Sequence, residues 1–235
     1  MNFLDPMMGG YGGQFAAGIL LTLEVSFCSY AAGMLFGMLG AAAKLSRWRA
    51  ARVIGGSYTT IVRALPELLL LLIAFYVLAG EVSGLAAAVG LVPADFSFSP
   101  FLVAIVSLGF IQGAYIAEIL RAGVLAVPRG QNDAALALGL SFWVRWGRVL
   151  VPQVLRHTLP ALGNVWLNAT KDSSLISVLG AFADVVKVSS FAAGATKQYM
   201  LFYGLAALCF LVISLISMAL LGMLHRRSRR GLHTA

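Results

Sequence analysis

Long stretches of apolar residues alternate with short polar connections along this chain. Five stretches can be drawn, approximately over residues 14–43, 53–79, 98–120, 154–183 and 198–224. Each is long enough to cross the hydrocarbon core of a membrane as a helix, which takes about 20 mostly apolar residues. Because several stretches exceed this length, we expect tilted or broken helices. The pattern predicts an all-α integral membrane protein with about five transmembrane helices.

The composition supports a membrane protein. Of the 235 residues, 60% are hydrophobic and 11% are charged, whereas soluble domains have roughly 45–50% apolar and about 25% charged residues. The chain contains no linker, low-complexity tract or internal repeat, so a single membrane domain over residues 1–235 is expected. A signal peptide is not expected, because residues 1–13 contain no basic residue and no small-residue cleavage site follows.

The distribution of basic residues predicts the orientation. Thirteen Lys and Arg residues lie in segments 44–52 and 121–157 and in the C-terminal tail, whereas the alternate connections hold only Lys187 and Lys197. Basic residues mark the cytoplasmic side of a membrane protein, which predicts an N-terminus outside, an outer loop at 81–99 and a C-terminus inside. The net charge of +8 therefore reflects topology, and nucleic-acid binding is not expected.

Catalytic and metal chemistry find little support in the sequence. Cys28 and Cys209 lie inside apolar stretches, where packing is the expected role. The three histidines (His157, His225 and His233) are scattered and predict neither a metal site nor a nucleophile–base–acid arrangement. The chain also lacks a GxxxxGK[ST] phosphate-binding loop, so any ATP used must bind to another chain.

The connection over residues 121–153 is too long and too apolar for a simple turn. Its alanines and leucines favour a short helix, and Gly139 fits a helix end or a close backbone contact. An amphipathic helix lying on the inner leaflet without a partner is the alternative interpretation. The spacing of one set of residues within this connection is informative: Asp133-Ala134-Ala135, Gly139, Val149, Val151 and Pro152.

This spacing resembles the loop through which ABC-transporter permeases contact their ATPase. In that pattern an acid and two alanines precede, at fixed offsets, a glycine and an apolar-x-Leu-Pro segment. Here Asp133 replaces the usual Glu, and Val149 and Val151 stand where the family has Ile and Leu.

Nearly the whole chain resembles the permease subunits of bacterial polar amino-acid ABC importers, especially the histidine, basic amino-acid and opine (octopine, nopaline) branch. The similarity is carried by Lys44-Leu45-Ser46, residues 58–68, residues 108–115, Glu118, Arg121-Ala122-Gly123, residues 127–131, Pro160, Gly163-Asn164, residues 171–175 and residues 184–187.

The resemblance implies a type I ABC-importer permease fold whose residues 129–152 form the cytoplasmic ATPase-coupling loop with a coupling helix. The implied contact residues are Arg129, Gly130, Gln131, Asp133, Ala134, Ala135, Gly139 and Pro152. Asp133 would pair with a basic residue of the ATPase, and the two small alanines would allow close approach. Closure of the ATPase would move this helix and reorient a central cavity, which is the alternating-access mechanism.

The resemblance also implies the partners and the location. We expect two copies of a cytoplasmic ABC ATPase, a second and similar permease that is commonly a different chain, and a periplasmic solute-binding protein. The chain would be a multi-pass protein of the bacterial inner membrane and not an enzyme. It would bind no cofactor itself, because ATP and Mg²⁺ would bind to the partner ATPase.

Charged residues inside the apolar stretches are the candidates for a substrate path. Each costs roughly 2.5–3.5 kcal/mol on insertion scales, so it requires a partner or a water-filled cavity. Arg63 is expected near mid-depth, and Pro66 should break the helix just before Glu67. Arg63 and Glu67 either neutralise each other as an i,i+4 pair or lie beside the substrate. Lys171, Asp172, Ser173 and Ser174 likewise either line the path or contain a structural pair.

Three further charges complete the set. Glu118 and Arg121 are three residues apart, and we expect an ion pair that orients the coupling loop. Glu24 either contacts the second permease or attracts a cationic substrate. Because a carboxylate is the natural counter-charge of a guanidinium or ammonium group, Glu24 and Glu67 are the candidate selectors, unless selection resides in the binding protein.

The sequence therefore predicts the permease subunit of an ATP-driven importer for polar amino acids. Basic amino acids (histidine, arginine, lysine, ornithine) or opines are the expected substrates. A self-contained secondary carrier or channel is the alternative, but it leaves the spacing over residues 129–152 unexplained. An intramembrane enzyme would need a catalytic pair, and the only conceivable one is Glu67 with Asp172.

Overall fold

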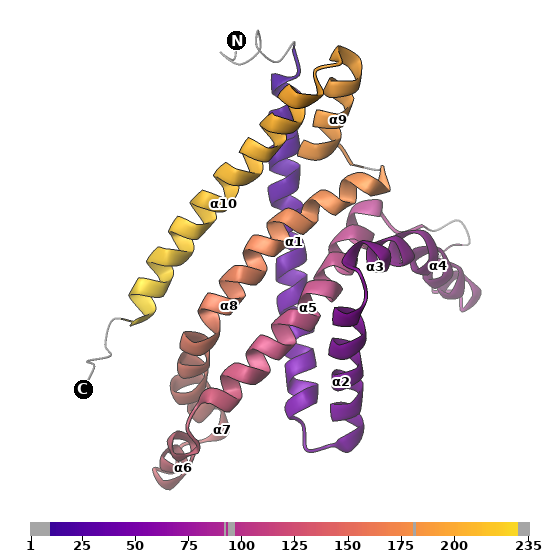
Figure 1. Cartoon of the computed structure of the whole chain (residues 1–235). Helices are drawn as coiled ribbons and strands as arrows, with labels where there is room; N and C mark the ends of the chain where they lie inside the picture. Colours follow the sequence, from indigo (N-terminus) through magenta and orange to yellow (C-terminus); the bar gives the residue numbers. More distant parts are fainter. Residues whose placement is uncertain (1–9, 92, 94–96, 181, 230–235) are drawn as a thin grey trace.

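The computed structural model describes residues 10–91, 93, 97–180 and 182–229, and every regular element among them is helical (Figure 1). The predicted all-α class is confirmed. The α-helices are α1 (Gly12–Leu45), α2 (Arg49–Ala64), α3 (Glu67–Ile73), α4 (Ala79–Ala88), α5 (Pro100–Ala126), α6 (Arg129–Ala137), α7 (Phe142–Val144), α8 (Val151–Asp172), α9 (Val185–Thr196) and α10 (Tyr199–Arg229). Two π-helical segments, η1 (Ala74–Leu78) and η2 (Arg145–Leu150), and the 3-10 helix η3 (Ser173–Leu179) join them.

Helices α1 and α5 form the centre of the bundle, and their backbones approach closely along a line of glycines. We call this contact the α1–α5 seam; it contains Gly33, Gly37 and Gly40 of α1 and Gly109 and Gly113 of α5. A Cβ on Gly37 would lie 2.4 Å from Ile116 Cγ2, and one on Gly109 would lie 2.6 Å from Ala32 Cβ. Small residues are required where membrane helices pack this tightly.

Buried hydroxyl groups along α1 are satisfied within the helix. Thr22 Oγ1 donates to Gly18 O at 2.8 Å, and Ser26 Oγ donates to Thr22 O at 2.6 Å. Both side chains are fully buried. Because lipid offers no hydrogen-bond partner, these bonds to the preceding turn let small polar residues occupy the packed face of a membrane helix.

The chain breaks at Pro66, as its ring predicts. Leu65 is extended (φ −99°, ψ 148°), because the residue before a proline is driven out of the helical region. Helix α2 ends at Ala64, and α3 begins at Glu67. The predicted apolar stretch 53–79 is therefore divided between two helices, as expected from Pro66. Helix α2 alone is about 24 Å long at 1.5 Å per residue, shorter than the hydrocarbon core.

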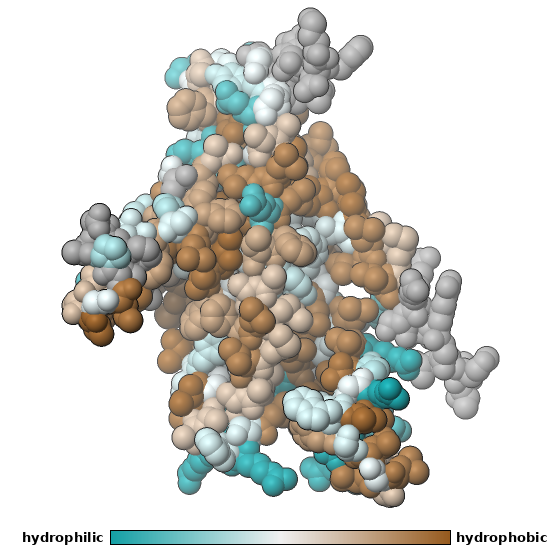
Figure 2. Space-filling model, turned by 180° about the vertical axis from the view of Figure 1, so that it is seen from behind, coloured by the Kyte–Doolittle hydropathy of each residue, from teal (hydrophilic) through white to brown (hydrophobic). Residues whose placement is uncertain are grey.

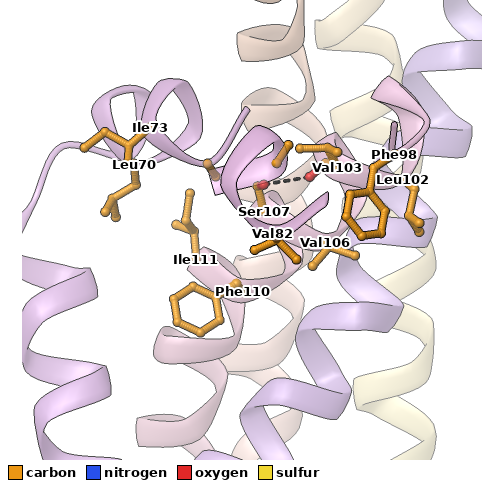
Figure 3. Close-up of a pocket in the computed structure, with 12 residues that line it drawn as sticks. Leu70, Ile73, Val82, Phe98, Leu102, Val103, Val106, Ser107, Phe110 and Ile111 are labelled. Atoms are coloured by element: carbon orange, nitrogen blue, oxygen red, sulfur yellow. Dashed lines mark hydrogen bonds between the residues drawn. The ribbon is translucent and has the colours of Figure 1, made fainter. Parts of the chain in front are cut away.

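The apolar residues after the break form a separate arm. We call α3, η1 and α4 together the α3–α4 arm; Figure 1 shows it projecting to one side of the bundle. Its residues Glu67–Ala88 are long and apolar enough to span a membrane. The outer loop predicted at 81–99 is thus helical as far as Ala88. An apolar groove of about 390 Å³ separates the arm from α5 (Figure 3).

Four helical stretches in the described residues are long and apolar enough to span a membrane, namely Gly12–Leu45, Glu67–Ala88, Pro100–Ala126 and Tyr199–His225. The predicted segment 154–183 corresponds to α8 and η3 and is not among them. Helix α8 carries Arg156, Asn164 and Lys171, which lower its hydropathy. It nevertheless packs inside the bundle, where the Trp166 Nε1–H donates to Ser217 Oγ of α10 at 3.1 Å.

The basic connections gather at one end of the molecule. Figure 1 shows the α1–α2 turn and α6 at this end, whereas α9 and the start of α1 lie at the other; α10 runs from the α9 end toward this end but stops short of it. Lys187 and Lys197 belong to the α9 end. Of the tail arginines, Arg230 lies outside the described residues. Figure 2 shows hydrophobic side chains over the middle of one face, with strongly hydrophilic ones gathered mainly at its lower end.

Candidate functional site

The predicted short helix in the coupling loop is present as α6. Pro128 stands immediately before it with φ −58°, which is pre-set for helix entry. At the other end Gly139 has φ +70°, its N–H donates to Leu136 O at 2.9 Å, and Leu140 N–H donates to Ala135 O at 3.1 Å. This pair of bonds is a Schellman motif. The prediction that Gly139 ends the helix is confirmed.

Helix α6 exposes most of the residues predicted to contact an ATPase. Asp133 and Ala134 are exposed, as are Arg129, Gly130 and Gln131 before them. Ala135 differs, because it is only 3% exposed and faces the protein. Of the two alanines, only Ala134 is exposed at the surface of the chain, while Ala135 serves the internal packing of α6.

The helix is braced against the start of α8. Gln153 Nε2 donates to Gln131 Oε1 at 3.3 Å and to Val149 O at 2.9 Å. Pro152 occupies the first turn of α8, directly after the π-helical segment η2. Between α6, the end of α5 and η2 lies a small pocket of about 190 Å³, lined in part by Val127, Trp146 and Leu150.

Glu118 of α5 is the centre of a charge cluster at the junction of three helices. Its Oε2 accepts from Arg121 Nε at 3.1 Å, so the predicted i,i+3 ion pair is present. Its Oε1 forms an ion pair with Lys44 Nζ at the end of α1, accepts from Thr59 Oγ1 of α2 at 2.9 Å and lies 4.0 Å from Arg63 Nη1. We call these five residues the Glu118 cluster. All three ion pairs between described residues involve Glu118.

A second charged group surrounds Tyr115 of α5. The guanidinium of Arg63 lies 5.4 Å from the centroid of the Tyr115 ring. Glu67 of α3 and Asp172 of α8 interact electrostatically with the Tyr115 hydroxyl. Residues from four helices therefore converge here, although Arg63 and Glu67 make no ion pair within the described part of the chain. The i,i+4 pairing considered from the sequence is wrong, because the break at Pro66 separates the two residues.

The remaining predicted path residues fall into different settings. Lys171 is exposed beside Asp172, and Ser174 Oγ donates to Lys171 O at 2.7 Å while remaining partly exposed. Ser173 is fully buried and donates to Thr170 O at 2.7 Å, so it does not line a path in this structure. Glu24 is exposed on α1 and joins neither charged group.

Asp184 is a buried carboxylate that the sequence reasoning did not single out. It is fully buried and caps α9 by accepting from Val186 N at 3.3 Å and Lys187 N at 3.4 Å, and Ser177 Oγ also donates to it. Burial raises the pKa of this carboxyl, while the three hydrogen bonds oppose the rise. An Asp immediately before an apolar helix start is an N-cap signal and could have identified it.

The apolar groove between the arm and α5 is not part of the charged groups. In Figure 3 its lining is aliphatic and aromatic apart from Ser107, whose Oγ donates to Val103 O at 2.6 Å. A polar substrate would lose its hydration there without gaining partners. The two charged groups therefore remain the candidates for a polar ligand.

Comparison with known proteins agrees with this geometry. The profile of the family described as "binding-protein-dependent transport system inner membrane component" matches residues 33–230. The chain is 42% identical over 210 residues to the nopaline transport system permease protein NocQ of Agrobacterium fabrum, covering 88% of each chain. It is 35% identical to the histidine/lysine/arginine/ornithine transport system permease protein HisQ of Salmonella typhimurium, covering 97% of this chain and 99% of the relative.

Two solved structures share the fold. A crystal structure of an amino acid ABC transporter with histidines contains a chain that superposes with a TM-score of 0.77 at 30% identity, covering 97% of this chain and 99% of that chain. The inward-facing MetNI methionine ABC transporter superposes with a TM-score of 0.74 over 94% of this chain and 98% of that chain. At 17% identity, the second similarity concerns the fold alone.

Proposed function

Because the chain belongs to the family of binding-protein-dependent transport system inner membrane components, we propose that it forms, with a second permease, the translocation path of an ATP-driven importer for basic amino acids or opines. The relatives named for nopaline and for histidine, lysine, arginine and ornithine support this substrate class. The observation that carries the proposal is α6, an exposed, capped and braced helix of nine residues at the end of the molecule where basic connections gather.

Helix α6 suits the transmission of force from a cytoplasmic ATPase. Only Val127 and Pro128 separate it from α5, so a push on α6 reaches a helix of 27 residues without crossing a flexible loop. Asp133 would pair with a basic residue of the ATPase, and two ATPase copies would serve the permease pair. ATP and Mg²⁺ would bind there, and this chain would need no cofactor.

The group around Tyr115 is the proposed contact with the substrate. A basic amino acid presents a carboxylate and a cationic side chain, which match Arg63 on one side and Glu67 with Asp172 on the other. Lys171 and Ser174 would border the same path. Glu24, exposed on α1, would meet either the second permease, commonly a different chain, or the cationic solute. The binding protein would deliver the substrate to the α9 end.

The coupling proposal is tested by reconstitution. Proteoliposomes containing this chain with the ATPase, second permease and binding protein of its transporter should take up labelled arginine or nopaline only with ATP, and vanadate should stop uptake. Asp133→Lys should reduce uptake by at least about tenfold, because a charge reversal at one pair costs on the order of 1.4 kcal/mol or more. Uptake by the purified chain alone, indifferent to vanadate, would instead indicate a secondary carrier.

The substrate contact is tested separately by Glu67→Gln. We expect the preference for cationic over neutral amino acids to fall by roughly tenfold, because one charge-assisted hydrogen bond to the cation is lost. Competition between labelled arginine and glutamine in the same vesicles measures the preference. Glu81→Gln, in α4, is the matched control. An unchanged preference would remove Glu67 from the selecting role and leave selection to the binding protein.

A further inference from the structure

The Glu118 cluster contains more positive charge than its carboxylate requires. Three cations, Lys44, Arg63 and Arg121, surround one carboxylate, and Thr59 donates a further hydrogen bond. Arg121 lies on the same helix as Glu118 and already forms a hydrogen bond at 3.1 Å. Placing a further cation whose side chain is mostly buried beside the same carboxylate is costly. Neutralising Glu118 therefore does not account for Lys44.

Lys44 is held in place by its surroundings. Its side chain is only 15% exposed, and its Nζ donates to Thr59 Oγ1 at 2.7 Å as well as binding Glu118. A Cβ on Gly55 of α2 would lie 2.9 Å from Lys44 Cγ, so the absence of a side chain there makes room for the lysine stem. The contact thus joins α1, α2 and α5 at one point.

The position of the Glu118 cluster along α5 indicates a function for this contact between three helices. Glu118 lies eight residues before the end of α5, about 12 Å along the helix axis, and α6 follows after two more residues. In the other direction, Arg63 links the cluster to Tyr115 through its 4.0 Å approach to Glu118 and its 5.4 Å approach to the ring. The cluster therefore stands between the proposed coupling helix and the proposed substrate contact.

We propose that Lys44 is a positioning residue of the transport cycle, which acts through Glu118 to tie α1 and α2 to α5. Movement of α6 then carries the three helices as one body and displaces Arg63 together with α5. Without this tie, α5 and the α1 packed on it along the α1–α5 seam move without α2, so Arg63 is left behind and ATP is hydrolysed without reorienting the path. The inference rests on the proposed importer function.

Lys44→Met is the informative variant, because it leaves Glu118 paired with Arg121 and bonded to Thr59. Glu118→Gln is harsher, since it leaves three cations without a counter-charge. In proteoliposomes of the full transporter, with labelled arginine and nopaline as probes, Lys44→Met should lower the number of molecules imported per ATP by roughly tenfold, the size of effect expected for one member of a contiguous network. The KM for the binding protein should not change.

Matched variants separate this role from general damage. Lys44→Arg should restore at least half of the import per ATP, and Arg49→Met, in the same basic segment but exposed and outside the cluster, should leave it unchanged. In a Glu118→Gln background, Lys44→Met should add no further loss. If Lys44→Met fails to assemble, Thr59→Val is the substitute variant. It removes another donor to Glu118 Oε1 without changing charge, and it should also lower the number of molecules imported per ATP.

The outcomes distinguish the inference from the function on which it rests. A wild-type complex without ATP-dependent uptake of either probe would overturn the proposed function. With wild-type uptake intact, three results would each overturn the role of Lys44: equal effects of Lys44→Met and Arg49→Met, a parallel fall of ATP hydrolysis and uptake, or additive losses with Glu118→Gln. If Lys44→Met does not assemble, an unchanged number of molecules imported per ATP in Thr59→Val would overturn the role of Lys44.

Discussion

The α1–α5 seam and the α3–α4 arm are both strongly apolar, yet they pack in opposite ways. Of the 18 residues that make up the apolar membrane-spanning stretch of α5, 56% are buried inside the chain. In the equivalent stretch of the arm, only 6% of the residues are buried. The seam is lined by glycines whose added Cβ atoms would collide with the facing helix. Around Gly80 and Gly84 of the arm, an added Cβ would meet nothing within 4 Å.

Because the seam and the arm are similarly apolar but differ in burial, hydrophobicity alone does not decide which membrane helices pack together. Lipid chains are as apolar as leucine, so burying leucine against protein gains little, and small residues that allow close backbone contact dominate instead. The seam has such residues and the Glu118 cluster at one end. In the arm Leu71 is buried inside the chain, whereas the exposed Leu68, Leu69 and Ile73 can be covered equally well by lipid or another subunit.

The largest predicted effect tests the seam directly. Gly37→Val places a side chain where the Cβ alone would lie 2.4 Å from Ile116 Cγ2 and 2.6 Å from Ile116 Cβ. Ile116 Cβ cannot move without shifting the helix, so we expect a loss of about 3 kcal/mol of stability and little folded protein. Gly84→Val in the arm is the matched control and should leave the thermal unfolding of the detergent-purified chain nearly unchanged. Equal effects at the two positions would contradict the contrast.

A smaller effect is expected at α6, where two glycines differ in backbone conformation. Gly139→Ala forces an L side chain into φ +70° and should weaken the helix end by roughly 1–2 kcal/mol. Gly130→Ala lies within the helix, with open space around it, and should stabilise it by about 0.5–1 kcal/mol. Hydrogen exchange of the α6 amides measures both changes. Slower exchange in Gly139→Ala would show that the Schellman motif does not hold this helix end.

The smallest effect concerns the groove beneath the arm. Val106 is 42% exposed and lines this groove, so Val106→Phe should change the stability of the isolated chain by no more than about 0.5 kcal/mol. Ala104→Phe, two residues earlier but fully buried, should be strongly destabilising. Thermal unfolding of both variants in the same detergent makes the comparison. A large loss in Val106→Phe would mean that the arm packs on α5 more tightly than this structure shows.

The sequence predicted those features that depend on neighbouring residues. The all-helical class, a short helix within the 121–153 connection, the end at Gly139 and the break at Pro66 all follow from local composition or backbone restrictions. The Glu118–Arg121 pair was predictable for the same reason, since residues three apart share a helix face. Asp184 carried an N-cap signal as well, but it was read only as part of a family motif.

Features set by distant contacts were not predictable. Lys44 was counted as one basic residue of a loop, yet it meets Glu118, 74 positions away, because the seam brings α1 and α5 together. The shift of the second span to Glu67–Ala88 depends on how the chain turns after Pro66. The burial of Ser173 depends on the packing of η3 against α1 and α9.

The interruption at Pro66 has an electrostatic consequence of its own. The last carbonyl groups of α2 and the first N–H groups of α3 lack helical partners, so a partial negative end and a partial positive end meet two residues apart. A zwitterionic amino acid likewise carries one positive and one negative group. If the proposed substrate contact beside Tyr115 is correct, the main chain would favour a zwitterion there whatever side chain the solute bears, and Glu67 would only distinguish among amino acids already bound.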